Sequence, residues 1–199
     1  MKDVVRPYPA TLAFDPPERV ANWRPLVNWL LAIPHLVVVG ALRYVSEVLG
    51  VLSWFIILFT GRLPAGIANF QVMYMRYYAR TGLFAGWLRE EYPPFDFTMT
   101  PTDPGNDPRV RVDVVPQLEG RNRLTVAFRL ILAIPQLVAF AVVAIANFVV
   151  LLVAFFAVLF TGRWPAGLRE FTVGFMRWFL RLEAYLFLLT DEYPPFTLK

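Results

Sequence analysis

The chain contains no cysteine and only one histidine, His35, among its 199 residues. Without cysteine it forms no disulfide and offers no thiolate as a nucleophile or metal ligand. A lone imidazole cannot supply the several ligands of a zinc site, and no metal-ligand spacing is found elsewhere. The sequence also lacks a nucleophile–base set and a dinucleotide-binding fingerprint. We therefore expect a protein that is not an enzyme and that binds no metal or cofactor.

Lysine is nearly absent, and one long stretch of the chain carries no charge at all. The net charge of +4 is almost entirely due to arginine, because Lys2 and Lys199 are the only lysines. No charged side chain occurs in residues 130–160, which is well beyond the roughly 18 residues of a transmembrane candidate. We infer an integral membrane protein. Its arginine excess suggests contact with anionic lipid headgroups rather than nucleic acid.

One motif occurs twice, as Leu-Phe-Thr-Gly-Arg-Leu-Pro-Ala-Gly at 58–66 and Leu-Phe-Thr-Gly-Arg-Trp-Pro-Ala-Gly at 159–167. Each copy closes a long apolar run and opens an arginine-bearing segment. Glycine adopts the left-handed conformation that often ends a helix, and proline suits the first turn of the next helix. We interpret both copies as helix–helix turns built on Gly61, Arg62 and Pro64, and on Gly162, Arg163 and Pro165. A ligand-binding loop is the alternative, although the spacing of a phosphate loop is missing.

The turn belongs to an internal repeat. Ala-Ile-Pro at 32–34 returns at 133–135, and Glu-Tyr-Pro-Pro-Phe at 91–95 returns at 192–196, at one constant offset. We divide the chain into a first repeat (1–100), a linker (101–109) and a second repeat (110–199). Each repeat is predicted to contain a strand, a long helix, the glycine turn, an arginine-bearing helix, the Tyr-Pro-Pro-Phe segment and another strand.

These three signatures, in tandem, resemble those of DUF4389, a bacterial membrane family whose function is unknown. The resemblance covers nearly the whole chain as two copies. It implies a protein of the bacterial cell (inner) membrane. It implies no activity, cofactor or catalytic residue.

The predicted fold is a mainly α-helical membrane protein with about four transmembrane helices. A small β element is expected from the N-terminus, the linker and the C-terminus. Two crossings per repeat would gather the strands on one side, where they form one sheet, because an isolated hairpin is only marginally stable. The alternative is an arginine-bearing helix that lies at the membrane interface, since arginine at the bilayer centre costs about 2.5–3.5 kcal/mol.

Arginines near helix ends predict the orientation. On the four-helix prediction, most of them lie on the side of the termini, and fewer lie on the side of the glycine turns. The first group is Arg19, Arg24, Arg89, Arg121 and Arg123, and the second is Arg62, Arg163 and Arg169. This bias predicts a multi-pass protein with cytoplasmic termini.

Two pairs of arginines are the main candidate site: Arg76 with Arg80, and Arg177 with Arg181. A spacing of four places each pair on one helix face. The hypothesis is a site for lipid phosphates or another anion, recognised by the guanidinium fork. Alternatively, the arginines reach the interface or pair with acidic residues such as Glu47, Glu170 and Glu183.

Other polar residues interrupt the apolar runs. Arg43 and Glu47 share a helix face and neutralise each other, Asn147 is expected to form an interhelical hydrogen bond, and His35 is expected to hydrogen-bond in a buried or interfacial position. The leading function is a structural or interaction module that engages anionic lipid and associates with itself or with a membrane-protein partner. The alternative is a small oligomeric transporter or channel whose polar path is lined by Arg43, Glu47, Asn147 and the arginine pairs.

Overall fold

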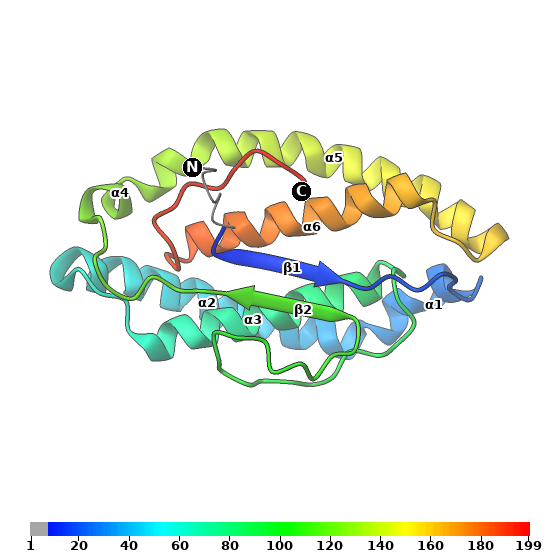
Figure 1. The fold of residues 1–199 in the computed structure, drawn as a ribbon, viewed down its shortest axis with the longest axis horizontal. Coiled ribbons are helices and arrows are strands. Elements are labelled where there is room, and N and C mark those ends of the chain that lie inside the picture. The colour runs from blue at the N-terminus through cyan, green and yellow to red at the C-terminus, as the bar shows by residue number, and fades with distance from the viewer. Residues whose placement is uncertain (1–7) are drawn as a thin grey trace, which may run out of the picture.

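The computed structural model describes residues 8–199, so the first seven residues of the predicted extended N-terminus lie outside the described part. The fold is mainly helical, as predicted, and has a small sheet (Figure 1). In chain order the elements are β1 (Ala10–Phe14), α1 (Arg24–Leu31), α2 (Ile33–Thr60), α3 (Ala65–Ala85), β2 (Val110–Val114), α4 (Arg123–Ala127), α5 (Arg129–Thr161) and α6 (Ala166–Leu186).

The predicted internal repeat is present, with α1–α3 corresponding to α4–α6. In the first copy the long apolar segment is interrupted at Ala32, and Pro34 lies in the first turn of α2, where its missing N–H leaves no helical hydrogen bond unmade. In the second copy the break falls earlier, at Phe128, and Pro135 lies inside α5. An interrupted long helix is therefore common to both repeats.

Both glycine turns end their helices as predicted. Gly61 and Gly162 have φ angles of 73° and 65°, and each amide donates to a carbonyl four residues earlier at 2.8 Å. A residue with a Cβ adopts this left-handed conformation only at a cost. The Thr60 hydroxyl bridges the Ile56 carbonyl and the Arg62 amide. Thr161 makes the equivalent contacts in the second copy.

Each turn packs against the segment that leads into the other repeat. The Leu63 amide donates to the Leu118 carbonyl at 2.8 Å, and the Val20 amide donates to the Gly162 carbonyl at 2.9 Å. The end of α2 therefore lies beside the start of the second repeat, and the end of α5 lies beside the start of the first. The two long helices consequently run antiparallel.

This arrangement corrects the predicted separation of turn arginines from entry-segment arginines. Arg62 lies 3.7 Å from Glu119, which belongs to the entry segment of the second repeat, and the Arg123 guanidinium lies against Gly61. Turns and entry segments share the same ends of the molecule. The arginine bias therefore gives no basis for cytoplasmic termini.

The sheet consists of β1 and β2, which pair antiparallel with Leu12 opposite Val112. It runs lengthwise beside α3 and α6, with β1 on α6 and β2 on α3 (Figure 1). Each strand thus packs on the arginine-bearing helix of the other repeat, which interlocks the two halves. In residues 8–199 the predicted strands at 95–99 and at the C-terminus are absent. In the first of these segments, the carbonyls of Thr98 and Thr100 bind Arg76 instead.

The central pair α3 and α6 is largely buried, whereas α2 and α5 remain exposed. In residues 8–199, α2 and α5 are the two helices that are long and apolar enough to cross a membrane, and most of their residues are not buried. The sequence predicted about four such helices. The structure has two helices of this kind. The helices α3 and α6 contain too many polar and charged residues, and many of their apolar side chains are buried in the core.

We predict that Gly162→Ala destabilises the protein by more than about 1–2 kcal/mol, the cost of a left-handed residue with a Cβ. The added carbon would lie 2.8 Å from Asn22 Oδ1 and 3.0 Å from the Val20 carbonyl. The control is Gly167→Ala in the same motif, where nothing lies within 4 Å. Denaturant unfolding in detergent measures both, and equal stabilities would contradict this account.

Candidate functional site

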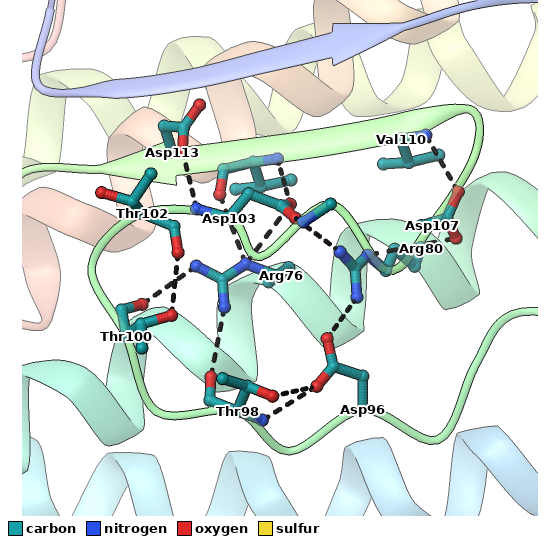
Figure 2. A network of polar contacts seen from close by, with 12 residues as sticks. Arg76, Arg80, Asp96, Thr98, Thr100, Thr102, Asp103, Asp107, Val110 and Asp113 are labelled. Carbon is teal, nitrogen blue, oxygen red and sulfur yellow. Dashed lines mark hydrogen bonds and ion pairs between the residues drawn. The ribbon is translucent and has the colours of Figure 1, made fainter.

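The first arginine pair points away from α2 and into the layer formed by β2 and the loop that precedes it (Figure 2). Arg76 is 2% exposed. It donates to the carbonyls of Thr98 at 3.2 Å, Thr100 at 3.0 Å and Val112 at 3.4 Å. Its Nε also lies 3.4 Å from Asp103 Oδ2. Every nitrogen of this guanidinium therefore faces an acceptor of the same chain.

Arg80 is 1% exposed and is held by carboxylates. It donates to Asp96 Oδ2 at 2.9 Å and to Asp103 Oδ1 at 2.8 Å. Asp107 lies 4.0 Å from Arg80 and receives a 2.6 Å hydrogen bond from the buried Arg89. Charge-assisted hydrogen bonds of this kind offset the cost of removing the ions from water.

The same aspartates shape the loop. Asp103 accepts from the amides of Gly105 and Val112, both at 2.8 Å, and Asp107 accepts from the Val110 amide at 2.9 Å. Burial alone would raise the pKa of Asp96, but hydrogen bonds from Thr98 and Arg80, with the charge of Arg80, lower it to about 2. Asp96 is therefore ionised at neutral pH, and the contacts of Asp103 and Asp107 tie the loop to β2.

These contacts change the interpretation of Arg76 and Arg80. Internal acceptors occupy the pair, so it is not open to a lipid phosphate. The proposed acidic partners on neighbouring helices were wrong for this pair. The true partners lie at residue 96 and in the segment 101–109, which was expected only to connect the repeats. The signal that could have identified them is the presence of three aspartates within the twelve positions 96–107, in the segment that follows the helix with the arginines.

The second arginine pair has a different environment. Arg177 donates to the Leu12 carbonyl at 3.1 Å, and Arg181 donates to the carbonyls of Arg177 and Lys199. No Asp or Glu side chain pairs with either arginine in residues 8–199, and Thr197 stands where the first repeat has Asp96. Burial, followed by the charge of Arg177, lowers the pKa of Arg181 from its usual value.

A cavity of about 290 Å³ lies beside this second pair. Both guanidinium-bearing side chains line it, together with Tyr8, Thr11 and Lys199. The two arginine pairs are therefore not equivalent. The first is neutralised within the fold, whereas the second borders a cavity and contacts only carbonyl oxygens among the described residues.

A larger cavity of about 530 Å³ lies between α2, α6 and the start of α5. Arg43 Nε lies 2.9 Å from Glu47 Oε1, which confirms the predicted pair. Its Nη1 lies 3.5 Å from Glu183 Oε1, a contact that the sequence did not indicate. Asn147 does not line this cavity. It is buried on α5, and its Oδ1 has no hydrogen-bond partner among the described residues.

The predicted polar path is not assembled. Arg43 and Glu47 are on α2 and Asn147 is on α5, and these helices make no extended contact because α3 and α6 separate them. Arg76 and Arg80 face the sheet instead. Arg177 and Arg181 border a cavity of their own beside β1, so the proposed path residues fall into four separate regions of the molecule.

His35 has the buried hydrogen-bonding role that was expected. It is fully buried, its Nδ1 lies 2.6 Å from the Tyr77 hydroxyl, and its ring stacks on Phe95. In the second repeat, Gln136 occupies the same position and accepts from Trp178 Nε1 at 2.9 Å. Both contacts join the long helix to the arginine-bearing helix. Among the described residues, no cluster of three or more His, Asp or Glu side chains could hold a metal ion.

We predict that Asp103→Asn destabilises the protein by about 3–5 kcal/mol, because it removes one charge from a buried ionic network. The control is Glu119→Gln, which removes a carboxylate from a pair whose side chains are 72% and 73% exposed. Such a surface pair contributes about 0–1 kcal/mol. Unfolding in denaturant compares the variants, and similar losses in both would show that the network does not hold the loop.

Comparison with known proteins gives one result. The family model described as a domain of unknown function, DUF4389, matches twice, at residues 22–96 and 123–197. No curated protein and no solved structure matches the chain. The two matched segments each run from the start of an apolar helix to the Tyr-Pro-Pro-Phe segment, and together they cover most of the sequence. The chain therefore belongs to the DUF4389 family, as a tandem pair of its domains.

Proposed function

We propose that the protein is a membrane-embedded structural module whose helices α2 and α5 lie in the plane of the membrane. The exposed apolar surfaces of these helices contact lipid, and the sheet and its loop face water. The observation that carries this proposal is that the two strands run lengthwise beside the helices rather than beyond their ends (Figure 1).

The course of the chain between α3 and the second repeat supports this orientation. The end of α3 lies beside α1, where Asn28 donates to the Phe84 carbonyl at 2.9 Å. The chain must then return to the opposite end of the molecule, where Leu118 meets Leu63. It makes this return as an irregular loop and β2. If α2 crossed a bilayer, residues 92–117 would have to cross it as well.

Such a crossing is unfavourable in lipid. The outer edge of β2 is hydrogen-bonded by the loop, where Asp107 and Asp103 accept from the amides of Val110 and Val112. A crossing would therefore carry this irregular loop and its charged side chains through hydrocarbon, where both are unfavourable. Thr11 and Arg111 are also exposed on the sheet. In the plane of the membrane, by contrast, this layer remains hydrated. The lengths of α2 and α5, 28 and 33 residues, then need not match a hydrocarbon core about 30 Å thick.

The arrangement also supports contact with anionic lipid, now confined to Arg177 and Arg181. Guanidinium groups bind phosphate through paired N–H donors. These two side chains border a cavity on the sheet side of α6, close to where headgroups would lie in this orientation. The alternative function, an oligomeric channel, requires the sheets of several copies to line a water-filled centre.

The orientation is tested with single cysteines, because the natural chain has none. Glu18→Cys and Glu119→Cys introduce exposed thiols at opposite ends of the long helices, and Thr11→Cys introduces one on the sheet. In sealed vesicles of uniform protein orientation, we expect an impermeant maleimide to label all three from the same side. Labelling of positions 18 and 119 from opposite sides would contradict the in-plane arrangement.

The lipid contact is tested by Arg177→Gln/Arg181→Gln in detergent with added phosphatidylglycerol and phosphatidylcholine. We expect native mass spectrometry to show a loss of the preference for phosphatidylglycerol. Arg111→Gln/Arg163→Gln removes the same charge from exposed positions and should keep that preference. An unchanged preference in the first variant would refute the assignment.

A further inference from the structure

The 530 Å³ cavity between α2, α6 and the start of α5, here called the α2–α6 pocket, combines an apolar wall with one polar end. The wall is formed by Val51, Trp54, Phe55, Leu130 and Leu186. Arg43, Glu47 and Glu183 form the polar end. Its volume falls within the usual range of small-molecule sites, roughly 300–1,000 Å³.

The polar end contains one cation for two carboxylates. Arg43 contacts both Glu47, at 2.9 Å, and Glu183, at 3.5 Å. Arg129 also borders the pocket, but its guanidinium already binds Asp191 and the Thr190 carbonyl and lies over the Tyr185 ring. One carboxylate of the pocket therefore has no cation of its own.

Glu183 is the carboxylate that lacks a complete set of partners. Its side chain is 6% exposed, and Oε2 has no hydrogen-bond partner among the described residues. Glu183 lines the pocket, and buried polar atoms without partners are rare in native proteins, so the position of Oε2 indicates a ligand that would bond to it.

The second repeat shows that the polar end is not required by the fold. At the equivalent positions, Arg43 is replaced by Ala144 and Glu47 by Phe148, and the residue equivalent to Glu183 is Gly82. Tyr74 and Tyr78 likewise become Phe175 and Phe179, and Gly50 becomes Leu151. The α2–α6 pocket therefore has polar side chains and a cavity, whereas most of the equivalent positions in the other repeat have apolar side chains.

We propose that the α2–α6 pocket binds an amphiphile with one hydrocarbon chain and a cationic ammonium head, which Glu183 anchors. The chain lies along Trp54, Phe55 and Leu186, whose apolar surfaces favour its burial. The head donates hydrogen bonds to Glu183 Oε2 and supplies the missing positive charge. This proposal does not depend on the orientation of the protein in the membrane.

The protonation of Glu183 is a further property that the ligand would change. Burial raises the pKa of the Glu183 carboxyl to about 8, against the opposing effect of Arg43 and with a further increase due to Glu47. The groups that face it are Arg43 and Glu47 from α2 and Tyr74 and Tyr78 from α3. At pH 7 the carboxyl is therefore largely protonated. An arriving ammonium favours the ionised form, so the proton leaves to the buffer.

The test is calorimetry on the full chain in a neutral maltoside detergent, with dodecylamine, dodecanol and dodecanoate as probes of equal chain length. We expect dodecylamine to bind most tightly and to release a proton at pH 7, measured from the heats in buffers of different ionisation enthalpy. Glu183→Gln should weaken amine binding roughly tenfold or more and abolish proton release, whereas the half-exposed Glu47→Gln should have a smaller effect.

A second variant keeps the test decisive if Glu183→Gln does not fold. Gly50→Leu copies the residue of the second repeat, and its Cβ would meet only ordinary contacts, the nearest at 3.5 Å from Phe187. It should fill the pocket and reduce binding of all three probes. Equal binding of the three probes by the natural protein, preference for dodecanoate, or no binding would each overturn the proposal.

Discussion

Two arginine side chains of α3 are buried because three aspartates and a set of carbonyl groups meet them from the opposite side. Burying a guanidinium without partners would cost several kcal/mol. The network therefore fixes where the loop 96–109 lies, and Asp103 and Asp107 in turn position the amides that begin and continue β2. Since β2 pairs with β1 along its whole length, the polar layer of the molecule depends on these contacts. That layer makes one side of the protein suited to water, while α2 and α5 are suited to lipid.

The repeat has preserved shape more strictly than charge. Both copies keep the left-handed glycine, the threonine that bridges the turn and the polar residue that joins the long helix to its neighbour. The charged groups differ. Arg80 has an aspartate at position 96, whereas Arg181 has Thr197 in the corresponding place, and the polar end of the α2–α6 pocket exists in only one copy. Features shared by both copies therefore build the fold, and features present in one copy are the ones on which the proposed binding functions rest.

Local signals allowed much of the fold to be predicted from the sequence. The turns at Gly61 and Gly162, and the internal repeat that they mark, each depend on short motifs of adjacent residues. The exchange of strands between repeats and the antiparallel course of α2 and α5 could not be predicted, because they depend on contacts between distant segments such as Val20 with Gly162.

The residues of the candidate site could be predicted from the sequence, but their contacts with distant segments could not. The arginines were correctly singled out, but the partners of Arg76 and Arg80 lie in a loop whose path no periodicity reveals. Glu183 was recognised as a possible partner of arginines, yet its contact with Arg43 joins opposite repeats. Two helices in residues 8–199, α2 and α5, are long and apolar enough to cross a membrane, so the prediction of about four transmembrane helices is not confirmed. The sequence alone did not reveal that the sheet packs on α3 and α6.

The orientation of the helices relative to the membrane is the central claim, and polarised infrared spectroscopy of oriented lipid bilayers tests it most directly. The dichroism of the helical amide band reports the average angle between helix axes and the membrane normal. Because α2, α3, α5 and α6 run side by side (Figure 1), one average describes them well. We predict axes close to the membrane plane. Axes close to the membrane normal would contradict the account and favour helices that cross the bilayer around a hydrated centre.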